Sequence, residues 1–330
     1  MDQISGTGTG GRPVNARATD TPPVGAAGSV LDLTEVVNEL RAARESWRSE
    51  HQRNREFGGR EFPSRTTLQR VVDDLAGALF PMRLGPPDLR QESEDYYVGH
   101  TLGVALHALH AQIRLELRRA ARSADGVSVD ERALAMVRTF AGRLPSLRRR
   151  LDTDVQAAYH GDPAAHSVDE VLLCYPGIIA IIHHRLAHEL YRLGAPLVAR
   201  IISELAHSAT GIDIHPGATI GESFFIDHGT GVVIGETAII GQHVRVYQAV
   251  TLGAKRFATD KDGYLRKGDP RHPIVEDDVV IYAGATILGR ITIGRASIIG
   301  GNVWLTHSVA PGSHVTLASS QYDTTENRPG

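Results

Sequence analysis

The sequence predicts an α+β protein: an N-terminal α-helical domain followed by a parallel β-helix with an extruded loop. Two observations predict this fold. Apolar residues recur at helical spacing up to about residue 207, and from residue 208 they recur every six residues. A period of six matches neither the 3.6 residues of a helical turn nor the two of a strand. It matches a triangular coil in which each hexapeptide forms one short strand and one corner.

The first 28 residues are predicted to be a disordered tail. Thirteen of them are Gly, Thr or Pro, and large apolar residues are nearly absent. Such a composition cannot bury enough apolar surface to offset the entropy lost on folding. We therefore expect the folded chain to begin near residue 29.

Residues 29–207 carry apolar stripes at helical spacing. The clearest stripe consists of Leu102, Leu106, Leu109, Ile113 and Leu117. Similar stripes predict helices over 31–40, 68–79, 129–159, 167–174 and 176–207. Pro81 ends the second of these, and Pro145 can bend the third.

The six-residue repeat predicts the core of the coil. Twelve of its thirteen positions carry Ile, Val or Leu: Ile214, Ile220, Ile226, Val232, Ala238, Val244, Val250, Val275, Ile281, Ile287, Ile293, Ile299 and Leu305. We expect these side chains to stack along the axis of the coil. The glycine positions shift by two residues near 226–234, which predicts a local irregularity beside Asp227 and His228.

Residues 253–272 interrupt the repeat with a polar, glycine-containing stretch. Because this stretch does not continue the coil, we expect it to leave the prism as a loop, and loops of this length in compact domains are usually functional. It holds all three lysines, Lys255, Lys261 and Lys267. The predicted domains are a tail (1–28), a helical domain (29–207), a coil with its loop (208–317) and a flexible C-terminal tail (318–330).

Composition and charge exclude several classes of protein. The formal net charge of −3 argues against a basic nucleic-acid binder. No run of about 18 apolar residues occurs, so no membrane span is expected. The single cysteine, Cys174, cannot form an intrachain disulfide, which favours a reducing cytoplasm as the location.

Five motifs on the coils resemble those of the serine O-acetyltransferases of bacteria and plants. They are D-I-H-P-G-A (213–218), F-I-D-H-G-T-G-V-V-I-G-E-T-A (225–238), Q-A-V-T-L-G-A (248–254), R-H-P-I (271–274) and Y-A-G-A-T-I-L-G (282–289). Upstream, G-D-P-A-A (161–165) and R-L-A-H-E-L-Y (185–191) are also similar to that family. The resemblance covers about 157–317 and favours a subgroup with a longer N-terminal region.

The resemblance implies a left-handed β-helix that transfers acetyl from acetyl-CoA to the hydroxyl of L-serine. The products would be CoA and O-acetyl-L-serine, a precursor for L-cysteine biosynthesis. A serine hydroxyl needs a general base, and His228 is the candidate because imidazole exchanges protons near neutral pH. Asp213, fifteen residues earlier, matches the family's partner carboxylate, which would orient the ring. The alternative is that His228 is only a corner residue.

The resemblance also assigns the groups that would hold the amino acid. Asp162 and Asp227 would hold the ammonium group, and Arg271 and His272 the carboxylate. Arginine suits this task because its fork of donors matches a carboxylate. The alternatives are that Asp162 caps a helix and that Arg271 is a solvated loop cation.

Acetyl-CoA is expected to lie along the coil, where small residues let its pantetheine arm approach the backbone. The predicted contacts are Ala283, Gly284, Gly300, Gly301, Gly253 and Ala254. Small residues are also needed at coil corners, which is the alternative for each position. We further expect the loop lysines to attract the CoA phosphates. Cys174 lies in an apolar, helix-like context and is expected to be packed, so direct transfer to serine is favoured over a covalent intermediate.

Other functions remain open on the sequence alone. The acceptor could be homoserine or a sugar, since one methylene is hard to exclude. A non-catalytic β-helix scaffold is a second alternative. A metal-dependent β-helix hydratase is disfavoured because no histidine pair in the coil has the required spacing, and His184 and His188 lack an evident third ligand. No metal is expected.

The resemblance implies a homotrimer, or a dimer of trimers, with L-cysteine as a feedback inhibitor in the serine site. Better-known bacterial members end in an isoleucine that docks into O-acetylserine sulfhydrylase. This sequence ends E-N-R-P-G. A complex formed through that anchor is therefore not expected.

Overall fold

The computed structural model describes residues 33–51, 62–120, 128–256, 261, 263–266 and 268–317. The predicted tails, 1–28 and 318–330, lie outside these residues, as does Lys267. The chain divides into two compact units, 1–58 and 59–330. The first unit contains helix α1 (Thr34–Glu50), whose apolar residues, including Leu33, Val36 and Leu40, are exposed within that unit.

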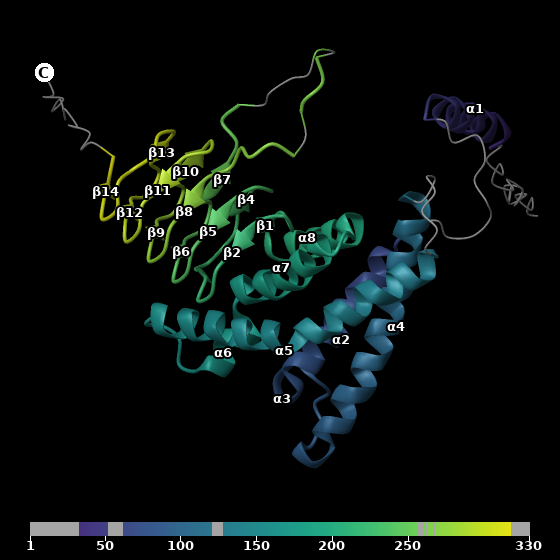
Figure 1. Ribbon diagram of the computed structural model, residues 1–330, viewed down its shortest axis with the longest axis horizontal. Helices are drawn as coiled ribbons and strands as arrows, with labels where there is room; N and C mark the ends of the chain where they lie inside the picture. The colour runs from purple at the N-terminus through teal and green to yellow at the C-terminus, as the bar shows by residue number, and fades with distance from the viewer. Residues whose placement is uncertain are drawn as a thin grey trace, which may run out of the picture. The chain divides into compact units, whose positions relative to one another are not determined.

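The second unit begins with seven α-helices and a short 3-10 helix (Figure 1). They are α2 (Arg65–Leu79), α3 (Pro81–Leu84), η1 (Gln91–Ser93), α4 (Glu94–Ala120), α5 (Val129–Gly161), α6 (Val168–Cys174), α7 (Pro176–Arg192) and α8 (Pro196–Thr210). The boundaries follow local signals: Ser64 and Ser128 cap α2 and α5 with their hydroxyls, and Pro176 and Pro196 open α7 and α8. The helical segments predicted from the stripes are confirmed, except that the segment predicted over 176–207 is two helices, α7 and α8, separated at residues 193–195. Helix α5 continues through Pro145.

Fourteen short parallel strands follow and form three sheets, which are the faces of a triangular coil (Figure 1). Sheet A contains β1 (Asp213–Ile214), β4 (Val233–Ile234), β7 (Thr251–Gly253), β10 (Thr286–Leu288) and β13 (Trp304–Leu305). Sheet B contains β2 (Thr219–Ile220), β5 (Ile239–Ile240), β8 (Ile274–Val275) and β11 (Thr292–Ile293). Sheet C contains β3 (Phe225–Ile226), β6 (Arg245–Val246), β9 (Val280–Ile281), β12 (Ile298–Ile299) and β14 (His314–Val315).

The predicted irregularity beside Asp227 and His228 is confirmed by the strand register. Ile214 pairs with Ile234, twenty residues on, whereas Ile234 pairs with Leu252, eighteen residues on. The first turn of the coil therefore contains two more residues than three hexapeptides. The extra residues lie between β3 and β4, where His228, Gly229 and Gly231 all have positive φ.

This insertion corrects the predicted core row. The thirteen positions do not form one row, because the two extra residues move the second part of the row out of the strands. Val232, Ala238, Val244 and Val250 lie just before the strands, and their places within the strands are taken by Ile234, Ile240, Val246 and Leu252. Both sets are buried, so the core of the coil contains two apolar residues per hexapeptide.

A buried ion pair joins the helices to the first turn of the coil. Arg185 of α7 donates to both carboxylate oxygens of Asp154 of α5, at 2.6 and 2.7 Å. The same guanidinium donates to the carbonyl oxygen of Gly221 at 2.8 Å, and the amide of Phe224 donates to Asp154 at 3.0 Å. Because Gly221 and Phe224 lie between β2 and β3, this network fixes the segment that leads into β3 against α5 and α7.

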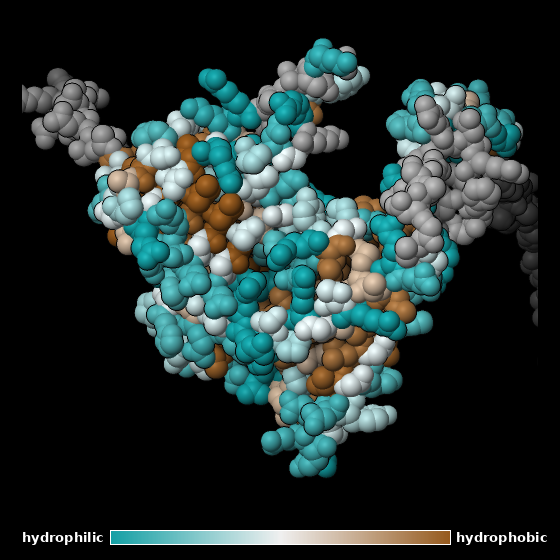
Figure 2. Space-filling model, in the orientation of Figure 1, coloured by the Kyte–Doolittle hydropathy of each residue, from teal (hydrophilic) through white to brown (hydrophobic). Residues whose placement is uncertain are grey.

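The surface is mainly hydrophilic, with apolar patches on the coil and the helices (Figure 2). Large apolar residues exposed on the coil are Val233, Ile239, Tyr282, Ile298, Trp304 and Leu317. Among the described residues no single helix could cross a bilayer by length and composition. The pair α6 and α7 passes that test only together, across a 74° bend.

Candidate active site

Two edges of the coil carry the polar residues of interest. The first edge consists of the corners that link sheet C to sheet A, at 227–232, 247–250, 282–285 and 300–303. The second edge consists of the corners that link sheet A to sheet B, at 215–218, 235–238, 254–273 and 289–291. Sheet A is the face between them.

His228 projects from the first edge. Its φ is +60°, and its side chain is 70% exposed. Positive φ is costly for a residue with a Cβ, but here it is the ordinary corner geometry, since Ser223, His243 and Ala249 share it. Nδ1 of His228 lies 3.7 Å from Oδ1 of Asp227, so Nε2 is the ring nitrogen that does not face that carboxylate.

Asp227 is buried and is held by a cation. Its Oδ2 accepts a hydrogen bond of 2.5 Å from Arg245 of β6, which pairs with β3. The Arg245 guanidinium lies over the rings of Phe225 and Tyr247, with its central carbon 4.9 and 4.6 Å from their centroids. These contacts fix the carboxylate beside His228.

Asp162 completes this group from the helical side. It directly follows α5, and its Oδ1 accepts from the amide of Ala164. Tyr175, the residue before α7, donates its hydroxyl to Oδ2 of Asp162 at 2.5 Å. This hydrogen bond and the Ala164 amide hold the pKa of Asp162 below its usual range, and Asp162 in turn raises the pKa of Tyr175 to about 12. Ser167, not Asp162, caps α6.

Arg271 and His272 lie on the second edge, around the β4–β5 corner. Arg271 donates to Oε2 of Glu236 at 2.6 Å, and Tyr191 of α7 donates to Oε1 at 3.0 Å. Burial raises the pKa of Glu236, but these two hydrogen bonds outweigh it and hold that pKa below its usual range. The amides of Arg271 and His272 both donate to the hydroxyl of Thr237, at 2.9 and 3.1 Å.

The His272 ring is buried and neutral near pH 7. Burial, followed by the charge of Arg271, lowers its pKa to about 4. The amide of Thr237 donates to Nδ1 at 3.0 Å, so in the neutral ring the proton is on Nε2. A Cβ on Gly235 would lie 2.0 Å from Cδ2 of His272, so glycine at this position leaves room for the ring.

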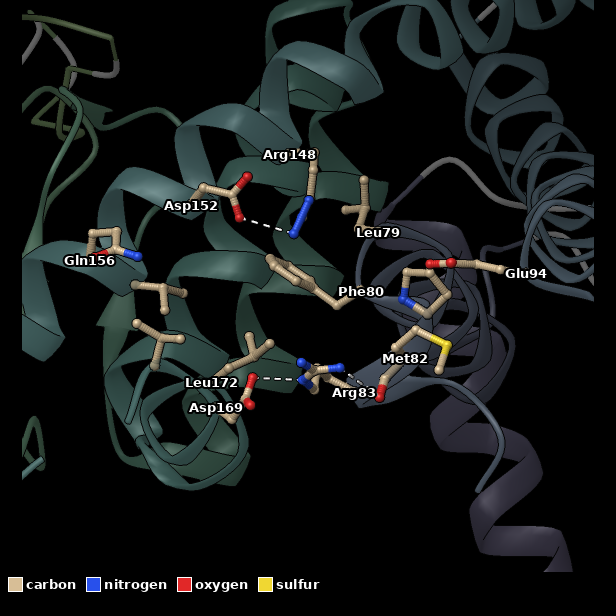
Figure 3. Close-up of a pocket in the computed structure, with 13 residues that line it drawn as sticks. Leu79, Phe80, Met82, Arg83, Glu94, Arg148, Asp152, Gln156, Asp169 and Leu172 are labelled. Atoms are coloured by element: carbon tan, nitrogen blue, oxygen red, sulfur yellow. Dashed lines mark hydrogen bonds and ion pairs between the residues drawn. The ribbon is translucent and has the colours of Figure 1, made fainter. Parts of the chain in front are cut away.

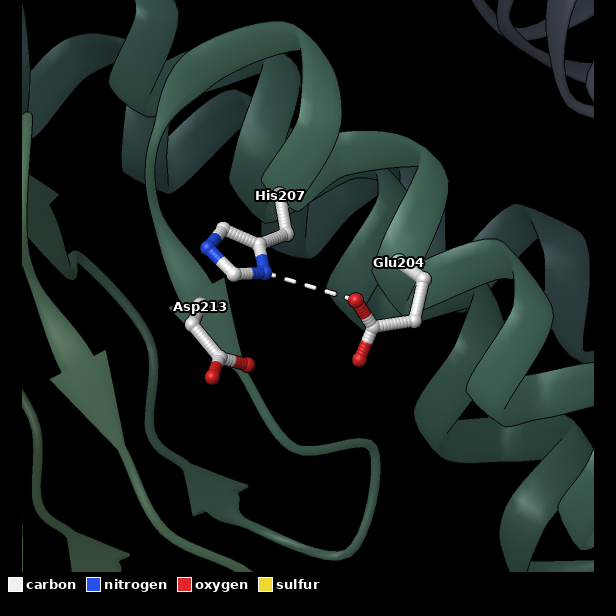
Figure 4. Close-up of side chains that lie close together, drawn as sticks. All are labelled: Glu204, His207 and Asp213. Atoms are coloured by element: carbon white, nitrogen blue, oxygen red, sulfur yellow. Dashed lines mark hydrogen bonds and ion pairs between the residues drawn. The ribbon is translucent and has the colours of Figure 1, made fainter.

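Asp213 does not contact His228 within the described chain. It is the first residue of β1, at the outward position of sheet A, and lies near Glu204 and His207 at the end of α8 (Figure 4). These three side chains lie close enough to share a metal ion. However, Oε1 of Glu204 already binds Arg200 at 2.6 Å, and Oε2 lies 3.3 Å from His207. Asp213 also raises the pKa of His215, a residue of the second edge whose pKa is lowered mainly by burial.

The predicted site residues therefore fall into two groups. Asp162, Asp227 and His228 gather at the first edge, and Arg271 and His272 at the second. A strand of sheet A with two or three residues, together with the corner residues on either side of it, separates the edges. About five residues lie across this face, a span of about 16 Å at about 3.3 Å per residue. Side chains on the two edges of one chain cannot share a substrate as small as an amino acid.

The predicted CoA contacts also divide between the edges. Ala283, Gly284, Gly300 and Gly301 stack in successive turns at or beside the first edge, where the amide of Asn302 donates to the carbonyl of Ala283 at 2.9 Å. Gly253 and Ala254 lie at or beside the second edge, where the stretch predicted to form a loop begins. A Cβ on Gly284 would lie 2.2 Å from Oδ1 of Asn302, so the corner packing itself requires glycine there.

Three further features lie apart from these groups. Cys174 is exposed, so its predicted packing is wrong; the short helix α6 ends at this residue before the bend into α7. His184 is buried, and Nδ1 of His188 donates to the carbonyl oxygen of Pro216 at 2.9 Å, as core residues do. A pocket of about 280 Å³ between α3, α5 and α6 is lined by Phe80, Arg148 and Asp169 and contains none of the predicted site residues (Figure 3).

Four residues that hold predicted site residues in place were not predicted from the sequence. Tyr175, Arg245, Glu236 and Thr237 each bind a predicted site residue. Glu236 and Thr237 stand in a quoted motif, which was the available signal. Tyr175 and Arg245 gave no such signal. Tyr175 lies 13 residues from Asp162 along the chain, and Arg245 lies 18 residues from Asp227.

The chain is similar in sequence to known serine acetyltransferases. The "Serine acetyltransferase, plasmid" of Synechococcus elongatus is 56% identical over 273 residues, which cover 81% of this chain and 86% of that protein. The serine acetyltransferase of Mycobacterium tuberculosis is 49% identical over 168 residues, 51% of this chain and 69% of that one. No family model matches the chain.

The fold also matches a solved structure. The crystal structure of serine acetyltransferase isoform 3 from Entamoeba histolytica in complex with cysteine has a TM-score of 0.66 and 36% identity, and covers 78% of this chain and 84% of its own. The expected fold, helices followed by a left-handed parallel β-helix, is confirmed. The extruded loop stays a prediction.

Proposed function

The chain belongs to the serine acetyltransferase family, and on that premise we propose how its residues carry out the reaction. The reaction is the transfer of the acetyl group of acetyl-CoA to the hydroxyl of L-serine. It yields O-acetyl-L-serine and CoA. The observation that carries the proposal is the first edge, where an exposed imidazole stands beside two carboxylates that other residues hold in place.

His228 acts as the general base. Its Nε2 accepts the proton of the serine hydroxyl as the oxygen attacks the thioester carbonyl. Asp227, 3.7 Å from Nδ1, stabilises the imidazolium that forms. When the carbon–sulfur bond breaks, the thiolate of CoA takes the proton from His228. No residue of the chain becomes acetylated in this scheme.

The two groups of residues hold opposite ends of the amino acid. Asp162 and Asp227 bind the ammonium group beside His228. Arg271 and the Nε2–H of the neutral His272 bind the carboxylate. Since these groups lie on different edges of one coil, the site is completed by the second edge of a neighbouring copy, and we propose a homotrimer built on the coil.

Asp213 is assigned to the second group. It lies on sheet A and influences the pKa of His215, a residue of the second edge. A neighbouring copy that presents Arg271 and His272 to His228 therefore also brings Asp213 towards it. The pairing of Asp213 with His228 that the family resemblance implies is proposed to form between copies.

L-cysteine is proposed to inhibit by occupying the serine site. The Entamoeba structure contains cysteine, and cysteine has the ammonium and carboxylate groups that these residues would bind. Acetyl-CoA is proposed to lie along the first edge, past Ala283 and Gly301.

The test is release of CoA thiol from acetyl-CoA with L-serine, L-homoserine or no acceptor. We expect serine-dependent release that falls about 100-fold or more in His228→Ala. His243→Ala is the matched control, because His243 is another exposed corner histidine with positive φ beside an aspartate, on the third edge of the coil. Inhibition by L-cysteine is followed by product formation, since its own thiol would react in the assay.

Each other outcome overturns one part of the proposal. Release with homoserine only would overturn the assignment of L-serine as the acceptor. No release with any acceptor would overturn acetyl transfer as the reaction. Equal activity in His228→Ala and His243→Ala would overturn the general base.

A further inference from the structure

Trp304 is the outward-facing residue of the last strand of sheet A. Its relative exposure is 68%, against 37% for Val233 on the same face. The outward row of this face consists of Asp213, Val233, Thr251, Thr286 and Trp304. Isolated exposed apolar residues are normal on protein surfaces, so the exposure alone assigns no role. The position of Trp304 along the coil is the observation that points to a role.

Trp304 lies three residues after Gly301, in the same turn of the coil and close to the first edge. From β4, which follows the His228 corner, three strand steps lead through β7 and β10 to β13. At about 4.8 Å per step, Trp304 lies about 14 Å further along the axis than β4. The direction of this displacement is the direction in which Ala283 and Gly301 follow His228.

The length of acetyl-CoA matches this displacement. Its pantetheine arm joins the thiol sulfur to the diphosphate through about 13 bonds. A peptide segment of four to five residues contains about the same number of backbone bonds. An extended chain of that number of residues spans about 15 Å. With the thioester at His228 and the arm along the first edge, the adenosine diphosphate therefore reaches the turn that contains Trp304.

We propose that Trp304 is the platform on which the adenine ring of acetyl-CoA stacks. This inference rests on the proposed function for the identity of the donor. An indole offers a broad aromatic face to a purine, and such stacking contributes substantially to binding of bases by proteins. Among the described outward residues of sheet A it is the one aromatic side chain.

A direct test uses the small number of tryptophans. The chain has two, Trp47 and Trp304. In a Trp47→Phe variant the fluorescence comes from Trp304 alone, and CoA should quench it with saturation, whereas pantetheine, which lacks the nucleotide, should not. This measurement needs no acceptor and no turnover. Saturable quenching without serine acetylation would therefore leave the platform standing and overturn the acceptor instead.

The kinetic test compares two donors. In Trp304→Ala we expect the KM for acetyl-CoA to rise about tenfold or more, with the KM for acetyl-pantetheine changed by less than about twofold. Trp304→Phe should recover part of the loss because it keeps an aromatic face. Ile298→Ala is the matched control, since Ile298 is an exposed, outward residue in the same turn on sheet C, and neither KM should change.

Sedimentation of Trp304→Ala separates the platform from a subunit contact. The platform predicts an unchanged oligomer. Loss of the oligomer, equal losses with both donors, or no quenching by CoA would each overturn the proposal and assign Trp304 to the contact between copies or to neither role.

Discussion

At the scale of single residues, the site depends on side chains that meet no substrate. Arg245 holds Asp227, Tyr175 holds Asp162, and Thr237 holds His272 through two atoms. Each of these contacts sets the direction or protonation of a group that is proposed to bind the amino acid. The arrangement makes the site sensitive to substitutions that leave every predicted site residue in place.

Gly235→Ala should reduce kcat/KM for serine by about tenfold or more while the protein stays folded. Its Cβ would lie 2.0 Å from the His272 ring, which must move away from the substrate carboxylate. Circular dichroism would report the fold. Gly142→Ala is the control, because a Cβ there meets nothing within 4 Å, and its activity should match the wild type. An active Gly235→Ala would show that the ring position is not required.

Stability should fall as the pH drops below about 6.5, and His184 should account for part of the loss. Burial holds the pKa of His184 well below its usual value, and Nδ1 of the ring has no hydrogen-bond partner in the described chain. The unfolded chain therefore binds a proton that the folded chain does not. The contribution of this histidine to the free energy of unfolding is fully present above the unfolded pKa of about 6.5. Below that pH it decreases by about 1.4 kcal/mol per pH unit.

Urea unfolding at pH 7.5 and pH 5.5 measures this effect. In His184→Leu the pH dependence of the free energy of unfolding should decrease by the amount that corresponds to about one proton. His100→Leu, on the exposed surface of α4, should leave this pH dependence unchanged. The same slope in both variants would exclude His184 as the source.

At the scale of elements, the helices serve the coil by positioning its first turn. The Asp154–Arg185 pair is almost completely buried and joins α5, α7 and the segment before β3. Burial raises the pKa of Asp154, and the charge and hydrogen bonds of Arg185 counter it. A pair of this kind is costly to break because the remaining partner keeps a buried charge.

Asp154→Ala should therefore lower the free energy of unfolding by about 3–5 kcal/mol. Asp169→Ala is the control, because the ion pair of Asp169 with Arg83 is about half exposed and solvent screening leaves it little effect on stability. Chemical denaturation of both variants gives the comparison. Similar losses in both would show that the buried network does not anchor the coil.

At the scale of the whole molecule, one chain presents two half-sites. In the proposed scheme the first edge supplies the base and the groups for the ammonium, and the second edge supplies the groups for the carboxylate. The triangular coil makes this division, because a sheet of several residues' width separates consecutive edges. Activity is then a property of the assembly.

Mixed oligomers test this division. Refolding His228→Ala together with Arg271→Ala at equal amounts should restore about a quarter of the wild-type activity, since one shared site in four combines two intact halves. His228→Ala with Asp213→Ala should also recover, because Asp213 is assigned to the second edge. Arg271→Ala with Asp213→Ala should not. Recovery of activity with Arg271→Ala and Asp213→Ala together would contradict the shared site. Absence of recovery in all three mixtures would also contradict it.

Much of the fold could be predicted from local pattern. The α4 stripe and the six-residue repeat depend on residues close in sequence, and both are confirmed. The core row was partly wrong because two extra residues at the β3–β4 corner shift one row into the place of another, and both rows are apolar. The packing of Cys174 was wrong because the apolar residues around it mark a helix that ends at this residue.

The sequence by itself determined the architecture, that is, the helices and the repeat, and it supplied the chemical types from which the site is proposed: the imidazole of His228 and the charged groups for an amino acid. Only the tertiary structure decided how these groups are divided. Whether two residues share an edge depends on how many residues lie in each turn and on which face intervenes, and the partners Tyr175 and Arg245 lie far along the chain from the groups they hold. The physical reason is that spacing along a chain sets local geometry, whereas a site forms where distant segments are brought together by packing.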